Sequence, residues 1–145
     1  MTKVLFCHGA QDRLQAAAAW LILAGADRPT LPNTTVYAPD SRIAERFDQF
    51  LWTNPATGFL PHCRADSPLA GETPVLIASN LEQLTRDECL LNLSDELPPG
   101  FSRFQNLVEI VNQEDGVRLP ARERVKFYRD RGYDIQFRDL QKEPL

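Results

Sequence analysis

The sequence predicts an α/β protein with a largely parallel sheet and helices packed on it. Short runs rich in Val, Leu, Ile and Phe alternate with helix-forming segments along the chain, an alternation typical of parallel sheets. The run Val75–Ser79 is continuously apolar, as expected of a strand buried on both faces. The length of 145 residues suits a single domain with its own core. We expect residues 1–140 to form that domain and residues 141–145 to form a short polar tail.

Two strand–helix units are predicted in the first part of the chain. Lys3–Cys7 is a predicted strand, and Asp12–Ala24, rich in alanine and leucine, is a predicted helix ended by a glycine. Thr35–Ala38 is a second predicted strand, and Asp40 or Ser41 can cap the helix that follows it. An Asn-Pro pair ends this second helix, and its apolar residues fall on one stripe: Ile43, Phe47, Phe50 and Leu51.

The rest of the chain is predicted to complete the sheet. Strands are expected at Cys89–Leu93, Asn106–Asn112 and Asp134–Asp139, with a helix over "LPARERVKFYRDRGYD" before the last of them. The segment Asn106–Asn112 has an alternative, because it could extend a short helix begun at "FSRF". The segment "RADSPLAGETP" reads as a loop and is the best candidate for a mobile region.

Composition argues against several classes of protein. No run of about 18 apolar residues occurs, so no membrane span is expected, and no secretory signal is expected at the amino terminus. Cys7, Cys63 and Cys89 form no CxxC pair, which fits reduced thiols in a cytoplasmic protein. The net charge of −4 argues against a surface devoted entirely to nucleic acid.

Motifs for catalysis, metal binding or nucleotide binding are not found in the sequence. The first strand–helix turn, "FCHGAQDRL", has one glycine and neither GxGxxG nor GxxxxGK[ST], so a phosphate cradle is hard to form there. Cys7-His8 and His62-Cys63 could each supply only one metal ligand easily, because neighbours on a strand point to opposite faces. We therefore expect no catalytic residue, metal or cofactor. A nucleotide-dependent enzyme on the same fold is the alternative.

Basic residues are concentrated between Val117 and Phe137, although the chain as a whole is acidic. At about 100° per residue, Arg122, Lys126 and Arg129 share one stripe of the predicted helix. An apolar seam beside this stripe is expected to face inward, through Ala121, Val125 and Tyr128. Between Arg118 and Arg131, only Glu123 and Asp130 oppose six basic residues: Arg118, Arg122, Arg124, Lys126, Arg129 and Arg131.

This separation of charge predicts an anion-binding surface, and a solvated helix face is the alternative. Nucleic acid as the ligand would need phosphate neutralisation along a groove. An acidic peptide with a terminal carboxylate needs only a few Arg or Lys donors beside one apolar hole. The adjacent seam favours the peptide.

A second candidate surface surrounds the Asn-Pro turn in "LWTNPATGFLPH". Turns are normally polar, but Trp52 precedes this one, and Phe59, Leu60 and Pro61 follow it. Exposed aromatic clusters mark binding sites, so we predict an interface with a partner. Packing in the core is the alternative, because Trp52 directly follows the apolar stripe of the helix.

Four segments together resemble the chi subunit of bacterial DNA polymerase III: "RFDQFLWTNPATGFLPH", "PVLIA", "LVEIVNQ" and "ARERVKFYRDRGYDI". Their order and spacing match over nearly the whole chain, although the amino-terminal third matches mainly in pattern. The LW…FLPH and RERxKxYRxxGY signatures are specific in combination. The resemblance implies a Rossmann-like fold without nucleotide binding. It also implies a non-catalytic role in the clamp loader assembly during DNA replication.

The resemblance further implies two partners, the psi subunit and the acidic carboxy-terminal tail of single-stranded DNA-binding protein. The protein would be cytoplasmic, associated with the nucleoid at replication forks, and would contact DNA only indirectly. Direct binding of single-stranded DNA is an alternative. By position, the psi contact falls on Trp52, Phe59, Leu60 and Pro61. The tail site falls on Arg118, Arg122, Lys126 and Arg129, with an apolar wall of Val111, Val125, Gly132 and Ile135. Val125 departs from the family, which often has an aromatic residue there.

Overall fold

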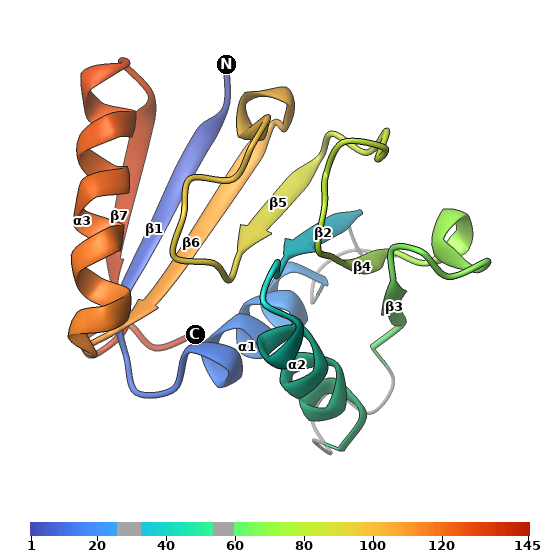
Figure 1. Ribbon diagram of the computed structural model, residues 1–145. Coiled ribbons are helices and arrows are strands. Elements are labelled where there is room, and N and C mark those ends of the chain that lie inside the picture. The colour runs from blue at the N-terminus through green and yellow to red at the C-terminus, as the bar shows by residue number, and fades with distance from the viewer. Residues whose placement is uncertain (26–32, 54–59) are drawn as a thin grey trace.

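Seven parallel strands form one twisted sheet in the order β3-β4-β2-β5-β6-β1-β7 (Figure 1). The computed structural model describes residues 1–25, 33–53 and 60–145. Every strand pair is parallel, so the predicted Rossmann-like α/β fold is confirmed. The strands are β1 Lys3–Ala10, β2 Thr34–Tyr37, β3 His62–Arg64, β4 Val75–Ala78, β5 Cys89–Asn92, β6 Asn106–Asn112 and β7 Asp134–Asp139. The helices are α1 Arg13–Gly25, α2 Ser41–Thr53 and α3 Asp115–Asp130, with short 3-10 helices η2 Ala70–Glu72 and η3 Phe101–Arg103.

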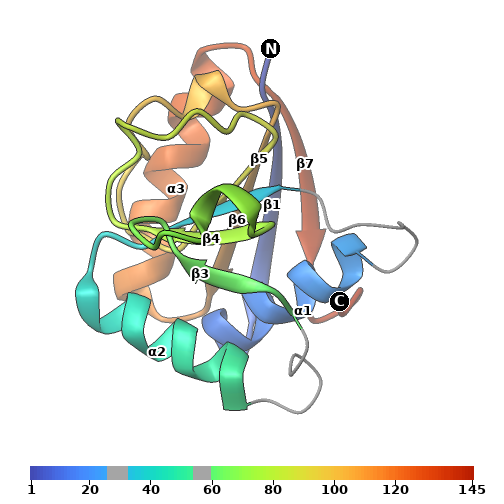
Figure 2. The same cartoon turned by 90° about the vertical axis from the view of Figure 1, so that its right-hand side faces the viewer.

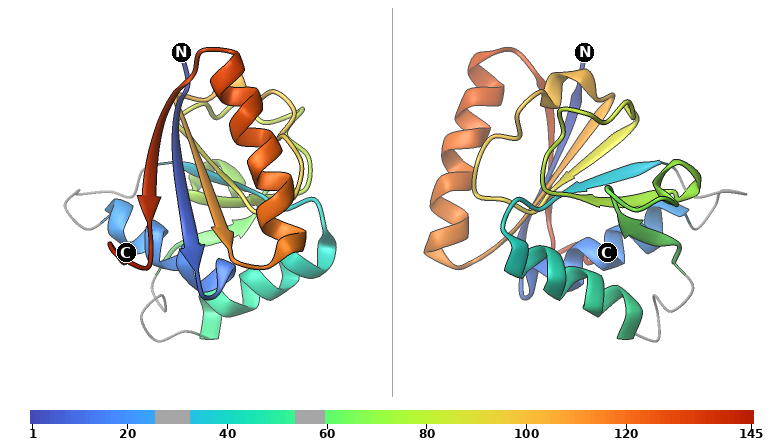
Figure 3. Two further views of the ribbon diagram at one scale, coloured as in Figure 1. Left: turned by 90° about the vertical axis from the view of Figure 1, so that its left-hand side faces the viewer. Right: turned by 45° about the vertical axis from the view of Figure 1, so that its right-hand side comes forward.

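Helices cover both faces of the sheet (Figures 2 and 3). Alternate residues of a strand point to opposite faces, and β6 shows the consequence. Its Val108 and Ile110 belong to the core beneath α1 and α2, whereas Leu107 and Val111 lie beneath α3. The fold thus has two apolar layers, and α3 stands alone on its face as the one long helix there among the described residues.

Strand β3 is the main element that the sequence pattern does not predict. It consists of only His62, Cys63 and Arg64, a run too short to show a strand periodicity. These residues form a strand because they pair with Val75–Ile77 at the edge of the sheet. A short edge strand depends on its neighbour more than on its own sequence.

The carboxy-terminal elements follow the prediction with one difference in a helix boundary. Helix α3 begins at Asp115, earlier than expected, and contains Pro120 within it. Gly132 lies just past its end with a φ of 80°, a backbone conformation that favours glycine. The segment Asn106–Asn112 is strand β6, so the alternative in which it extends a helix is wrong.

The segment expected to be mobile is partly anchored. Arg86 donates hydrogen bonds to the carbonyl oxygens of Pro74 and Ala70 over 2.9 and 2.7 Å.

Among the described residues, none of the helices is both long enough and apolar enough to cross a bilayer.

Candidate binding groove on helix α3

A buried polar network, here called the Glu109 network, lies between α3 and the sheet. Glu109, in the middle of β6, has no exposed surface. Arg124 of α3 donates from Nε and Nη2 to the two carboxylate oxygens of Glu109 over 2.8 and 3.0 Å. Tyr128 Oη donates to the same carboxylate over 2.7 Å, and Asn92 Nδ2 of β5 donates to it over 3.1 Å. A buried carboxylate of this kind needs such partners, because burying an unpaired charge is very costly.

The network also shifts the pKa values of Tyr128 and Arg124. Burial raises the pKa of Tyr128 far above its ordinary value, and the negative charge of Glu109 adds to that rise. Burial alone would lower the pKa of Arg124, but the hydrogen bonds and attraction from Glu109 outweigh it and raise the pKa. Arg124 therefore stays charged to balance Glu109. It does not belong to the exposed basic surface.

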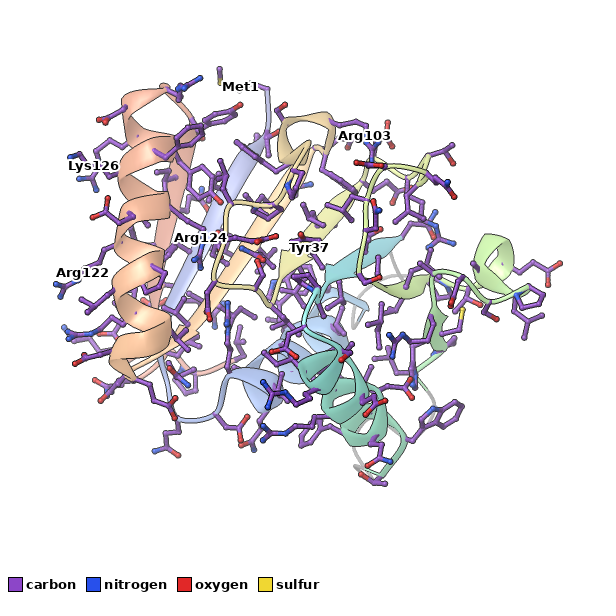
Figure 4. All side chains as sticks on the ribbon, viewed as in Figure 1. Met1, Tyr37, Arg103, Arg122, Arg124 and Lys126 are labelled. Carbon is purple, nitrogen blue, oxygen red and sulfur yellow. The ribbon has the colours of Figure 1, made fainter. Side chains whose placement is uncertain are left out.

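The Glu109 network fixes which side of α3 faces solvent. Residues two positions apart on a helix lie roughly 200° apart around its axis. Because Arg124 points at Glu109, Arg122 and Lys126 point away from the sheet, and both are exposed. Figure 4 shows Arg124 directed inward and the other two side chains on the outer side of the helix.

A hollow of about 530 Å³ lies where α3 passes over β1, β6 and β7, and we call it the α3 groove. Its floor is apolar and contains Phe6, Val111, Val125 and Phe137. The rings of Phe6 and Phe137 meet edge to face, with centroids 5.8 Å apart. The guanidinium of Arg129 lies 6.0 Å from the centroid of the half-exposed Phe137 ring. The floor can therefore accept an aromatic or aliphatic side chain.

The rim of the groove along α3 is cationic. It is formed by Arg118, Arg122, Lys126 and Arg129. Only Arg118 among these has a carboxylate of the described residues within ion-pair distance, at 2.7 Å from Asp115. The other three cations are available to an external anion. Cations beside an apolar floor suit a ligand that combines carboxylates with an apolar side chain.

The structure brings most of the predicted tail-site residues together. Gly132 and Ile135 do not line the groove, because α3 ends before them and Ile135 packs into the core beside Phe6. The residues that do line it are Arg118, Arg122, Lys126, Arg129, Val111 and Val125. Sequence reasoning missed the contribution of β1 and β7 and the residues after them: Phe6, His8, Gly9, Phe137, Asp139 and Gln141.

The second predicted surface lies at the carboxyl end of α2. Trp52 is 64% exposed, and its ring contacts the buried His62 ring with centroids 4.6 Å apart. Pro61 is exposed and Leu60 is half-buried against the core. We call Trp52, Leu60 and Pro61 the Trp52 surface. Phe59 lies outside the described residues.

Part of the usual nucleotide position of an open α/β sheet is occupied by a side chain of the protein itself. In such folds ligands bind outside the carboxyl ends of the strands. Here the buried side chain of Arg13 lies at those ends of β5 and β6, and burial lowers its pKa. Arg13 donates from Nε to the carbonyl oxygen of Ile110 and from Nη2 to that of Ser94, each over 2.7 Å. No group of three or more potential metal ligands occurs within residues 1–25, 33–53 and 60–145.

Together the fold and the site define a Rossmann-like α/β protein in which Arg13 covers the carboxyl ends of β5 and β6 and the α3 groove is basic with an apolar floor. Residues 1–136 match the family described as DNA polymerase III chi subunit, HolC, and the chain belongs to this family. The DNA polymerase III subunit chi of Escherichia coli (strain K12) is 34% identical over 97 residues, which cover 66% of each chain. That of Pseudomonas aeruginosa is 29% identical over 101 residues, 70% of each chain. That of Haemophilus influenzae is 29% identical over 93 residues, 63% of this chain and 65% of the relative.

Proposed function

We propose that this chain acts in DNA replication as a non-catalytic chi subunit of DNA polymerase III that connects two other proteins. The α3 groove binds the acidic carboxy-terminal tail of single-stranded DNA-binding protein, and the Trp52 surface binds the psi subunit of the clamp loader. The protein would work in the cytoplasm, at the replication forks of the nucleoid. It would contact DNA only through its partners.

The observation that carries the proposal is the composition of the α3 groove. Arg122, Lys126 and Arg129 form a cationic rim without carboxylate partners among the described residues. Phe6 and Phe137 form an apolar floor next to that rim. An acidic peptide that ends in a phenylalanine would match both, because its carboxylates would accept charge-assisted hydrogen bonds and its ring would meet the floor.

The positions of the two surfaces support a connecting role. Strands β7 and β3 form the two opposite edges of the sheet (Figure 1). The α3 groove lies over β1 and β7, whereas Trp52 packs on His62 of β3. Two partners bound at these places would not compete for the same surface. A mixture of both partners with this protein should therefore form a ternary complex in gel filtration.

Calorimetric titration with an acidic peptide ending in Pro-Phe tests the groove. Lys126→Ala should weaken binding by about tenfold, because a charge-assisted hydrogen bond in a partly dry site is lost. Amidation of the peptide's carboxyl end should weaken it comparably, and added salt should weaken it further through screening. Arg131→Ala is the matched control, since Arg131 ends the same helix but does not line the groove.

Three results would contradict this half of the proposal. The first is equal affinity for the free and the amidated peptide, which would leave a solvated basic helix. The second is tighter binding of a single-stranded oligonucleotide than of the peptide, which would favour direct DNA binding. The third is saturable micromolar binding of ATP or NAD, which would favour a nucleotide-dependent enzyme.

Fluorescence of Trp52, in a Trp20→Phe background, tests the second surface. Addition of psi should shift the Trp52 emission as its exposed ring becomes buried. Trp52→Ala should weaken the complex by about 2 kcal/mol or more, as for an interface hot spot, and leave the free energy of unfolding nearly unchanged. A loss of several kcal/mol of stability would instead assign Trp52 to the core.

A further inference from the structure

We propose that Asp115 sets the affinity of the α3 groove by competing with the ligand for Arg118. In the unbound protein Asp115 holds the Arg118 guanidinium, and an entering carboxylate displaces it. This inference rests on the proposed function of the groove and adds an internal competitor to it.

The ion pair between these residues has the geometry of a reversible contact. Arg118 Nη2 donates to Asp115 Oδ1 over 2.7 Å, and the two residues are three positions apart on α3. The Asp115 side chain is 74% exposed and the Arg118 side chain is 42% exposed. Arg118 lines the groove, whereas Asp115 does not. The carboxylate can therefore swing into water without disturbing the groove wall.

Arg118 also has a donor without an acceptor among the described residues. Its Nε atom is buried and has no hydrogen-bond partner in the described structure. A buried donor without an acceptor is unfavourable. A guanidinium offers Nε and Nη2 as a parallel pair, which a carboxylate can accept in bidentate fashion. Asp115 accepts only from Nη2, so a ligand carboxylate that reached both atoms would bind Arg118 more completely than Asp115 does.

Two consequences follow for recognition. Anions that bind weakly or accept only one hydrogen bond would not displace Asp115. The ion pair therefore selects ligands that can accept two hydrogen bonds from the Arg118 guanidinium. The ligand must also break the Asp115–Arg118 ion pair before it can bind Arg118. The wild-type groove therefore binds the ligand more weakly than it would without Asp115. Arg122, Lys126 and Arg129 carry no such competitor among the described residues.

Asp115→Asn is the test, because it keeps the size of the side chain and removes the competing charge. We expect the acidic peptide ending in Pro-Phe to bind this variant about two- to fivefold more tightly, the range that corresponds to an exposed ion pair. Asp130→Asn is the matched control: it removes the same charge from an exposed position on α3 that does not line the groove. It should change the affinity less than Asp115→Asn does.

A double-mutant cycle separates competition from general electrostatics. In an Arg118→Gln background, Asp115→Asn should no longer tighten binding. A gain that persists without Arg118, or an equal gain from Asp130→Asn, overturns the proposal. Binding is measured at a temperature where all variants are folded, because an acidic residue at a helix amino terminus also stabilises the helix.

Inorganic phosphate serves as a second probe, with the NMR signal of Arg118 Nε–H as the readout. Phosphate should shift this signal at lower concentration in Asp115→Asn than in the wild type. If the peptide fails to bind the wild type but this difference is seen, the proposed function is refuted and the competition stands. If phosphate shifts the signal equally in both proteins, the competition is refuted whatever the peptide does.

Discussion

Helix α3 carries arginines on two opposite sides, and the two sides use them in different ways. Arg124 faces the sheet, is 4% exposed and makes two hydrogen bonds to Glu109. Arg122, two positions earlier, faces solvent on the rim of the α3 groove. The same residue type thus serves as a fixed internal partner in one place and as an available cation in the other.

The buried ion pair also bears on where the exposed cations of the same helix lie. The Glu109 network splits the apolar layer beneath α3 into one part around Tyr128 and another around Val111. A helix lying on uniformly apolar residues could settle at several rotations, whereas a bidentate ion pair accepts only one. We infer that the network holds the basic rim in place over the groove floor. The following predictions test the contrast between the two sides of the helix.

The largest effect is expected from Glu109→Gln. This substitution keeps the shape of the side chain but leaves Arg124 buried without a counter-charge. The free energy of unfolding should fall by about 3–5 kcal/mol, the cost of breaking a buried ion pair by removing one partner. Urea denaturation measures it, and the double variant Glu109→Leu with Arg124→Met should lose less than the single one. A loss below about 1 kcal/mol would show that water reaches the network.

A smaller effect is expected from Tyr128→Phe. The hydroxyl group of Tyr128 donates to the Glu109 carboxylate over 2.7 Å in a site closed to solvent. Its removal should cost about 1.5–3 kcal/mol, as for a hydrogen bond to a charged group. Tyr133→Phe is the matched control, because Tyr133 packs against the same aromatic cluster but is only partly buried. Equal losses in the two variants would assign the effect to packing alone.

Most of the fold could be predicted from the sequence because its signals are local. Runs such as Val75–Ala78 are apolar throughout, and helices such as α2 carry their apolar residues on one stripe. Strand β3 could not be predicted, since three polar or small residues become a strand only beside β4. The predicted apolar wall includes Val111 and Val125 of the groove floor, but the two aromatic floor residues were missed for a related reason. Phe6 and Phe137 come from the two ends of the chain, and sequence order does not reveal that β1 and β7 are neighbours.

The sequence contains a signal of the Glu109 network that was not part of the predicted site. "NLVEIVN" is an apolar strand with a carboxylate at its centre, and a charge in a buried strand requires a partner. Arg124 and Tyr128 are four residues apart on the inner side of the basic helix, so they could have been named as that partner. The predicted anion-binding surface included every basic residue of the segment, so the pairing of Arg124 with Glu109 was not predicted.

Alkaline pH should lower the free energy of unfolding through buried groups whose pKa values are raised, including Tyr37 and Tyr128. Burial raises the pKa of Tyr37 to about 12, with a further rise from its hydrogen bond to Glu96, and the pKa of Tyr128 is raised as well. Below pH 10 both tyrosines are protonated in the folded and unfolded states. Above about pH 10 the unfolded state ionises first, so stability should fall by up to about 1.4 kcal/mol per pH unit for each tyrosine.

Urea unfolding at pH 9, 10 and 11 measures this slope. Tyr128→Phe and Tyr37→Phe should each remove a share of the slope. Cys7, whose pKa burial raises to about 11, should contribute a further share that both variants retain. A slope that is unchanged in both variants would assign the alkaline loss to other groups.

The smallest effect on stability is expected from Arg122→Ala, and it is the sharpest test of the contrast. Arg122 is exposed and has no carboxylate of the described residues within ion-pair distance, so its removal should change the free energy of unfolding by no more than about 0.5 kcal/mol. Arg124→Ala, two positions away, should cost several times as much because it leaves the buried Glu109 carboxylate without its counter-charge. Arg122→Ala should instead clearly weaken binding of the acidic peptide, while the free energy of unfolding stays nearly unchanged. If Arg122→Ala destabilises the protein as much as Arg124→Ala does, then both sides of α3 serve the fold, and the rim of the groove has no cations reserved for a ligand.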